Sequence, residues 1–236
     1  RLLIPLILGI LFIIPPQSYF ENLQKADFDG SYLDFYPHFF NGIYPEGNLH
    51  WGHLWFLFYL FVFSLVSSKL FTTLKSTDKK KLINQFANRF QRGHSIFLLA
   101  IPIIIIEIAL RWLFSGFQTF ITDWANVFHY LFLFILGFLI YSDLSLIDAV
   151  LNNKKKAICA AIPLSIGFLI VNLLSSSAFA GYNANPTLSY LIDHPETILY
   201  YILLMFFKVA AEWSWLIVFL GYSRKFLSNT SRGIKH

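Results

Sequence analysis

The chain has 236 residues, of which 56% are hydrophobic and 13% are charged, with a formal net charge of +5 and a mean hydropathy of +0.59. Soluble globular domains have about 25% charged residues. This composition therefore excludes an ordinary water-soluble domain and indicates an integral membrane protein. The single cysteine, Cys159, excludes an intramolecular disulfide, a CxxC redox pair and a cysteine-based zinc cluster.

Six apolar segments are predicted to cross the membrane as α-helices, because about 20 apolar residues are needed to span the hydrocarbon core. The first, Leu2–Ile14, is shorter than that. Since the chain begins with Arg1 rather than Met, we interpret this segment as the remaining part of a span whose start lies upstream. The other five are predicted at Leu54–Phe71, Ser95–Phe114, Val127–Tyr141, Ala157–Ser175 and Thr197–Leu220.

The basic residues predict the orientation of these spans, because Lys and Arg accumulate on the cytoplasmic side. In a six-span arrangement 15 basic residues fall at cytoplasmic positions and one, Lys25, at an outer position, while Arg111 and Lys208 lie inside spans. The sequence therefore predicts an all-α, polytopic bundle of about six transmembrane helices with both termini in the cytoplasm. This topology accounts for the positive net charge without nucleic-acid binding. The predicted cytoplasmic basic residues are Arg1, Lys69, Lys75, Lys79, Lys80, Lys81, Arg89, Arg92, Lys154, Lys155, Lys156, Arg224, Lys225, Arg232 and Lys235.

Two pairs of opposite charges lie within the predicted spans, Glu107 with Arg111 and Lys208 with Glu212. Their i,i+4 spacing places both members of a pair on one helix face. A lone charge at mid-bilayer costs at least about 2.5–3.5 kcal/mol, so such residues normally face protein or a water-filled cavity. Two interpretations remain open: each pair neutralises itself and helps the helices pack, or the four residues line a polar chamber. Arg111 has the further alternative of extending to the outer headgroups.

The predicted outer loop Pro15–His53 combines many aromatic residues with acids and histidines, among them Asp34, His38, His50 and His53. A loop of this length without strong helix signals is usually functional or disordered, and the aromatic content argues against disorder. Aromatic faces beside carboxylates suit a sugar ligand, whereas an interfacial aromatic belt would explain the rings alone. The i,i+3 spacing of the last two histidines matches no metal-binding motif, so no metal site is predicted.

Three stretches carry a resemblance to a known family. They are RLLIPLILGILFIIPPQ at Arg1–Gln17, FYPHFFNGIYPEGNLHWGHLWFL at Phe35–Leu57 and WSWLIVFLGYSRKFL at Trp213–Leu227. Together they resemble the membrane-bound acyltransferase 3 family, which acylates sugars and other envelope or small-molecule acceptors, and HLWFL is the most specific element. The resemblance implies one partial transmembrane acyltransferase domain over residues 1–236. The family's histidine in an R/K-x10-H motif and a late span are expected outside the chain.

The resemblance also implies a reaction, the transfer of an acyl group, often acetyl, from cytoplasmic acyl-CoA to an acceptor hydroxyl. Arg1 matches the second arginine of the family's RxxR motif, and its guanidinium is expected to pair with CoA phosphates. His53 matches the HLWFL element and is the catalytic candidate, because a histidine can remove the proton from an attacking hydroxyl. Acceptor binding is expected from Asp34, His38, His50 and Trp55.

The expected partners are membrane lipid, acyl-CoA as co-substrate and a carbohydrate or small-molecule acceptor, with no bound cofactor, no metal and no nucleic acid. The expected location is the bacterial inner membrane. A transporter or lipid-linked sugar flippase that uses the same buried charges is the main alternative, and a non-catalytic sensor or scaffold is a third. An R/K-x10-H motif in a preceding span would favour the enzyme, and a second, symmetry-related half would favour transport.

Overall fold

The computed structural model describes residues 1–25, 27–43, 47–76, 80–114, 120, 122–178 and 188–230, with residues 176–178, 188 and 225–230 described by their backbone alone. All secondary-structure elements named in these described residues are helices, which confirms the predicted all-α class. Among the residues used to predict orientation, Lys79, Arg232 and Lys235 lie outside the described ranges. The contacts divide the chain into two compact units, Arg1–Lys69 with Phe117–Thr122, and Leu70–Gly116 with Asp123–His236.

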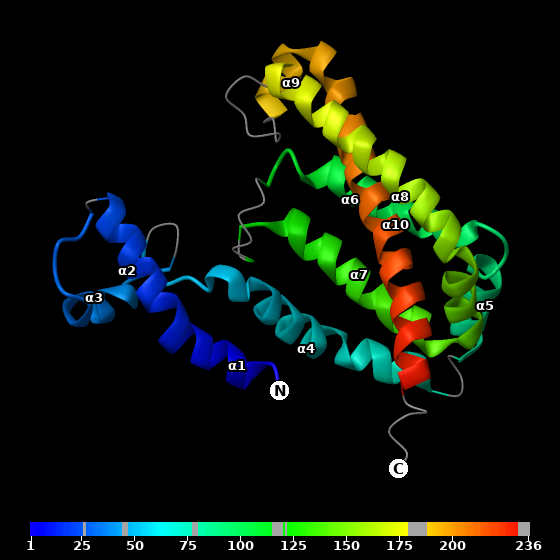
Figure 1. Cartoon of the computed structure of the whole chain (residues 1–236), viewed down its shortest axis with the longest axis horizontal. Helices are drawn as coiled ribbons and strands as arrows, with labels where there is room; N and C mark the ends of the chain where they lie inside the picture. Colours follow the sequence, from blue (N-terminus) through cyan, green and yellow to red (C-terminus); the bar gives the residue numbers. More distant parts are fainter. Residues whose placement is uncertain are drawn as a thin grey trace. The chain divides into compact units, whose positions relative to one another are not determined.

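The first unit begins with one continuous helix, formed by α1 (Leu3–Leu8), a π-helical turn (Gly9–Ile13) and α2 (Ile14–Lys25) (Figure 1). The prediction that Pro15–His53 is a loop was therefore wrong for two segments. The first helix continues to Lys25, and a second helix, α3 (Tyr32–Phe39), follows. A 3₁₀ turn (Gly52–Leu54) then leads into α4 (Trp55–Lys75), which runs on into the second unit.

Two prolines inside the first helix explain why the sequence did not indicate it. A proline removes the backbone hydrogen bond to the carbonyl four residues earlier. In an α-helix the carbonyl of Leu11 would accept a hydrogen bond from the backbone nitrogen of residue 15, and in a π-helix from that of residue 16. Both residues are prolines, Pro15 and Pro16, whose nitrogens carry no hydrogen. The hydroxyl of Tyr36, in α3, donates to this Leu11 oxygen at 3.2 Å. A tertiary hydrogen bond thus replaces the missing backbone donor, and the helix continues.

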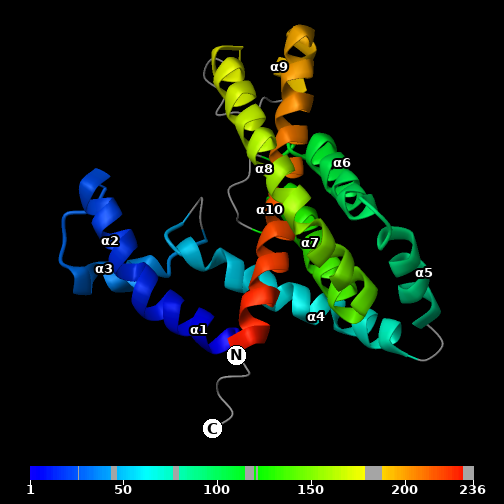
Figure 2. The ribbon, with the colours of Figure 1, turned by 45° about the vertical axis from the view of Figure 1, so that its right-hand side comes forward.

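In its described residues, the second unit contains the end of α4, six further helices and 3₁₀ turns at Ser95–Leu99 and Pro195–Thr197. Its two longest helices, α8 and α10, lie side by side in both views (Figures 1 and 2). Glycines allow this close approach, because a Cβ added at Gly167 would lie 2.5 Å from the ring of Phe207 and one at Gly221 would lie 2.8 Å from Cβ of Lys154. The helices are α5 (Lys80–Phe90), α6 (Ala100–Leu110), α7 (Trp124–Ser142), α8 (Leu144–Ala178), α9 (Leu188–Asp193) and α10 (Ile198–Thr230).

A sharp turn separates α5 from the apolar segment that leads into α6, and the two directions differ by 117°. Gly93 adopts a positive φ of 57° in this turn, a conformation that glycine adopts without strain. The side-chain amide of Asn153, in α8, donates to the carbonyl of Gly93 at 2.9 Å and holds the turn in place. The third span therefore starts near Ser95, as predicted, but α6 ends at Leu110.

Five helices in the described ranges are long and apolar enough to cross a membrane, and the bent α5–α6 pair brings the number to as many as six. This agrees with the predicted six-span bundle. The helix that contains the fifth span starts earlier than the predicted span, because α8 begins at Leu144 and includes the Lys154–Lys156 run. Lysine is a good helix former, and the ammonium of Lys154 donates to the carbonyl of Leu151 within the same helix.

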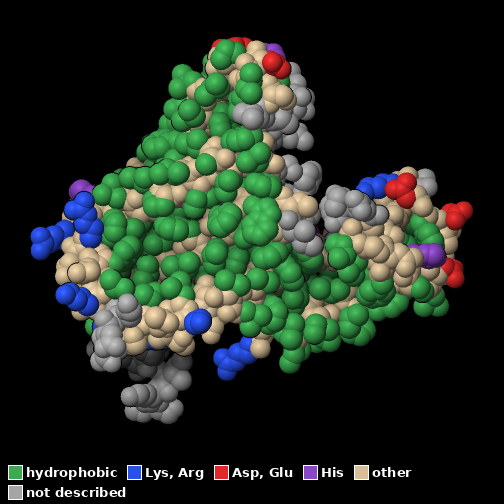
Figure 3. All heavy atoms as spheres, turned by 180° about the vertical axis from the view of Figure 1, so that it is seen from behind, with side chains coloured by type: hydrophobic (Ala, Val, Ile, Leu, Met, Phe, Trp, Pro, Cys, Tyr) green, Lys and Arg blue, Asp and Glu red, His purple; other side chains and the backbone are tan. Residues whose placement is uncertain are grey.

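The surface of the second unit separates charge from apolar area (Figure 3). Hydrophobic side chains cover its flank, Lys and Arg gather at the end near α5, and Asp and Glu appear at the opposite end near α9. Exposed apolar residues on α8, such as Ile166, Leu169 and Leu173, add to the apolar surface of this unit. A hydrophobic belt between two polar ends is the surface expected of a protein surrounded by lipid.

Candidate functional site

A buried cluster of ionisable and amide side chains lies inside the second unit, where α6, α7 and α10 meet. Each helix presents its polar residues on one face, since they are spaced three, four or seven positions apart. The surrounding positions are apolar, so the polar face must turn inward to find partners. The cluster, called the ionic network below, consists of Glu107, Arg111, Asp123, Asn126, His129, Tyr201, Lys208 and Glu212.

Glu107, on α6, is the centre of the ionic network and is fully buried. Arg111 donates to both of its carboxylate oxygens, from Nε to Oε2 at 2.9 Å and from Nη2 to Oε1 at 2.6 Å. Lys208 donates from Nζ to Oε2 at 3.0 Å, and Nδ1 of His129 lies 2.7 Å from Oε1. A buried carboxylate requires such compensation, because an unpaired charge in a protein interior costs several kcal/mol.

His129, on α7, joins two carboxylates. Its Nδ1 contacts Glu107, and its Nε2 lies 3.0 Å from Oε1 of Glu212 on α10. A neutral imidazole has only one N–H, whereas two ionised carboxylates can only accept hydrogen bonds. The three groups must therefore share two protons, either as an imidazolium between two carboxylates or as a neutral imidazole with one protonated carboxyl. This arrangement can hold a proton and move it along the histidine between the two acids.

Arg111 connects the ionic network to the start of α7. Its Nη2 donates to the side-chain oxygen of Asn126 at 2.8 Å, and its Nη1 lies 3.8 Å from Asp123. Asp123 caps α7, accepting from the backbone N–H of Asn126 at 3.1 Å and from its amide at 2.6 Å. Only 4% of the Arg111 side chain is exposed. The alternative that Arg111 extends to the headgroups is therefore excluded.

The two i,i+4 pairs behave differently. Glu107 and Arg111 bond to each other within α6, as their spacing predicts. Lys208 and Glu212 form no ion pair with each other in the described structure, and each bonds to another helix instead. The idea that this second pair neutralises itself is thus wrong, because its members neutralise Glu107 and contact His129.

The ionic network has one open edge. The side chains of Glu107 and His129 are almost completely buried, whereas those of Lys208 and Glu212 are 37% and 31% exposed. Both exposed groups come from α10. Tyr201, two turns before Lys208 on this helix, donates its hydroxyl to the carbonyls of Glu107 and Ile108 at 3.2 and 3.0 Å. A proton or a polar ligand could therefore reach the buried centre by way of α10.

The predicted acceptor residues lie in the first unit, and Asp34 and His50 bond to groups that are close to them in the sequence. Asp34 forms a capping box with Ser31 at the start of α3, and its Oδ2 accepts from the Ser31 hydroxyl at 2.6 Å. That hydrogen bond lowers the pKa of Asp34. The Nδ1 of His50 accepts from the backbone N–H of Gly52 at 3.1 Å, and burial lowers the pKa of this imidazole.

The remaining predicted residues differ in accessibility. His53 is exposed on the 3₁₀ turn before α4, and His38 is exposed near the end of α3. Trp55 packs edge-on against Phe56 and Tyr59. Arg1, the predicted CoA-binding residue, is exposed before α1. These site assignments stay predictions.

Sequence reasoning missed four members of the ionic network: Tyr201 on α10, and three residues at the start of α7, Asp123, Asn126 and His129. The signal was present, because the three residues are spaced by three along an otherwise apolar helix and so share a face. No group of three or more His, Cys, Asp or Glu residues in the described part of the chain has the arrangement of a metal site.

A family model described as an acyltransferase domain matches residues 1–223. The chain belongs to the acyltransferase 3 family. This acyltransferase match runs through both units and contains the whole ionic network, and it confirms the resemblance carried by the sequence motifs. With its apolar helices, the chain is a membrane acyltransferase of this family. No curated protein and no solved structure matches the chain significantly.

Proposed function

We propose that this acyltransferase moves an acyl group, acetyl in the simplest case, from acyl-CoA to a hydroxyl of an envelope carbohydrate or a related acceptor in the bacterial inner membrane. The observation that supports this proposal is the family match over residues 1–223. In the reaction the acceptor oxygen attacks the thioester carbonyl carbon, a C–O bond forms and the C–S bond breaks. The hydroxyl proton must be removed, and the leaving thiolate must receive one.

His53 is the proposed proton acceptor within this chain. Its imidazole is exposed at the entrance of α4, whereas the Nδ1 of His50 is already occupied by a backbone N–H. Asp34, His38, His50 and Trp55 are proposed to form the acceptor side, where aromatic faces and polar groups suit a sugar ring. Arg1 is proposed to pair with the phosphates of CoA.

The ionic network is proposed to support the reaction by keeping a proton inside the second unit. Its histidine is held between two carboxylates, and its open edge carries Lys208 and Glu212. Because both ring nitrogens of His129 are already held by carboxylates, its surroundings need little rearrangement when its proton moves. Glu107 and Arg111 act as positioning residues for His129.

Reconstituted full-length protein provides the test of acyl transfer. Proteoliposomes would receive radiolabelled acetyl-CoA and an acceptor extract, and mass spectrometry would identify the acetylated product. We expect His53→Ala to abolish most acceptor turnover while acetyl-CoA binding, measured by calorimetry, stays nearly intact. Arg1→Ala should mainly weaken acetyl-CoA binding. Absence of label transfer by the wild-type protein, with bound acetyl-CoA present, would contradict the proposed reaction.

A transporter or flippase is the second candidate, and the ionic network is the observation that favours it. Ionisable residues buried in spans are typical of proton-coupled translocation, and here Glu107, His129 and Glu212 form a continuous chain. In sealed proteoliposomes with an imposed pH gradient, a transporter would accumulate substrate without acetyl-CoA. An enzyme would need acetyl-CoA and would release free CoA in proportion to product.

A further inference from the structure

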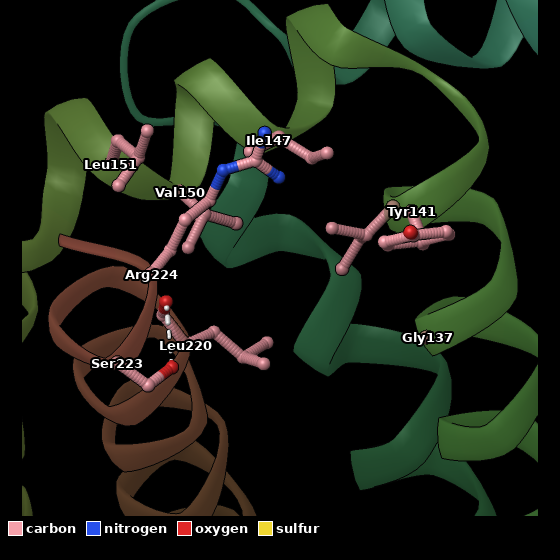
Figure 4. Close-up of a pocket in the computed structure, with 9 residues that line it drawn as sticks. Gly137, Tyr141, Ile147, Val150, Leu151, Leu220, Ser223 and Arg224 are labelled. Carbon is pink, nitrogen blue, oxygen red and sulfur yellow. Dashed lines mark hydrogen bonds between the residues drawn. The ribbon is translucent and has the colours of Figure 1, made fainter. Parts of the chain in front are cut away.

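An apolar cavity lies between α7, α8 and α10 of the second unit, away from the ionic network (Figure 4). Its volume is about 320 Å³, which is at the lower end for small-molecule sites in proteins. Gly137 and Tyr141 line it from α7, Ile147 and Leu151 from α8, and Leu220 from α10. Because its walls are almost entirely hydrocarbon, the cavity suits an apolar chain rather than a polar metabolite.

The cavity opens on the flank of the unit. Tyr141 is 82% exposed and Leu220 is 46% exposed, so two of the lining side chains also belong to the outer surface. In a protein that spans a membrane this flank faces lipid. A hydrocarbon chain can therefore enter sideways from the bilayer without crossing the protein.

A basic residue, Arg224, lies at the edge of this apolar cavity. Arg224 lines the cavity, and its side chain extends from α10 toward Ile147 of α8 (Figure 4). None of the ion pairs among the described residues includes Arg224. Lys154 adds a second positive charge, because its ammonium donates to the carbonyl of the lining residue Leu151 at 2.9 Å. The hydroxyl of Ser223 donates to the carbonyl of Leu220.

We propose that this cavity is a binding site for an anionic phospholipid, with one acyl chain in the cavity and the phosphate on Arg224. A guanidinium binds phosphate oxygens in a bidentate manner, and basic pockets between transmembrane helices bind anionic lipid headgroups. The basic residues around Arg224 are those predicted to face the cytoplasm, so the lipid comes from that leaflet. This site is independent of the proposed acyl transfer, because it uses neither the ionic network nor the first unit.

A substitution at Gly137 can fill the cavity without disturbing the backbone. A Cβ added at Gly137 would have no heavy atom within 4 Å, so a larger side chain has space to enter. Leucine is also a better helix former than glycine, which favours folding of the variant. Gly137→Leu therefore removes the acyl-chain site, and Arg224→Gln removes the phosphate contact while the cavity stays open. Arg92→Gln is the matched control, because Arg92 is an exposed basic residue that follows α5.

Native mass spectrometry of the full-length protein, titrated in detergent with phosphatidylglycerol or phosphatidylcholine, tests the site. We expect tighter binding of phosphatidylglycerol, a loss of about tenfold in Arg224→Gln from the missing charged hydrogen bonds, and loss of the bound lipid in Gly137→Leu. Arg92→Gln should bind like the wild type. A photoreactive phosphatidylglycerol should label peptides around Tyr141 and Leu151, and this readout also serves if Gly137→Leu does not fold.

Three results would overturn the proposal. The first is unchanged phosphatidylglycerol binding in correctly folded Gly137→Leu, because the lipid would then lie elsewhere. The second is equal affinity for the two lipids in the wild type, which would remove the role of Arg224. The third is displacement of the photoreactive lipid by palmitoyl-CoA in proportion to its concentration, which would make the cavity a donor site. None of these measurements depends on acyl transfer.

Discussion

The two units of this acyltransferase use polar residues in different ways. In the first unit, polar side chains bond mostly within their own segment, as Asp34 does with Ser31 and His50 with Gly52. In the second unit, the bonds of Glu107 to His129 and to Lys208 join residues 22 and 101 positions apart. An exposed acid can use water or a nearby N–H, whereas a charge inside an apolar span must find charged partners, on its own helix or on another one. Acids and histidines therefore bond locally in the first unit, whereas in the second unit Glu107 and His129 also form tertiary contacts.

The largest expected effect is that of removing the buried carboxylate at the centre of the ionic network. Glu107→Ala leaves Arg111, Lys208 and His129 without their common partner, and we expect it to lower the free energy of unfolding by about 3–5 kcal/mol. Denaturant unfolding in detergent, followed by tryptophan fluorescence, would measure it. Asp148→Ala, which removes an exposed carboxylate from α8, is the control and should change stability little. A similar loss in both variants would contradict the central role of Glu107.

The second prediction concerns the partners of Lys208. A double-mutant cycle of Lys208→Met with Glu107→Gln should give a coupling energy of about 0.5–3 kcal/mol, because these residues form a partly buried ion pair. The cycle of Lys208→Met with Glu212→Gln should give a smaller value, since these two residues bond to different groups. A larger coupling energy for Lys208 with Glu212 than for Lys208 with Glu107 would instead support the pairing within α10 that the i,i+4 spacing suggested.

A smaller effect is expected in the first unit, where one hydroxyl compensates for two prolines. Tyr36→Phe leaves the carbonyl of Leu11 without its donor, and we expect a loss of about 1 kcal/mol in local stability. Hydrogen exchange of the α2 amides should become faster in this variant. Tyr32→Phe, one turn earlier on α3, is the control, and equal protection in the two variants would show that the Tyr36 bond contributes nothing.

The smallest expected effect is a pH dependence of the first unit. Burial lowers the pKa of His50 below its ordinary value of 6.5, so the unfolded chain takes up a proton at a higher pH than the folded one. The contribution of His50 is therefore neutral above pH 6.5, and stability falls as the pH drops below that value. Limited proteolysis near Gly52 should be faster at pH 5.5 than at pH 7.5. His50→Gln should flatten this dependence, and an unchanged dependence would assign it to another group.

The sequence was sufficient for the features that depend on local pattern. Five helices and one bent pair agree with the predicted spans, because the length and apolarity of a span are properties of one continuous segment. The Glu107–Arg111 bond was also predictable, since i,i+4 neighbours on a helix are always close. The family resemblance rested on continuous motifs, and the match over residues 1–223 confirms it.

Tertiary structure decided the rest. Whether Pro15 and Pro16 end a helix depended on a hydroxyl from α3, and which carboxylate Lys208 neutralises depended on how α6 and α10 pack. His129 became part of the ionic network only because α7 places it between two acids from other helices. A sequence determines which side chains need a partner, because that follows from their own polarity and the apolar residues around them. Only the packed helices determine which partner they receive, because hydrogen bonds require atoms within about 3 Å.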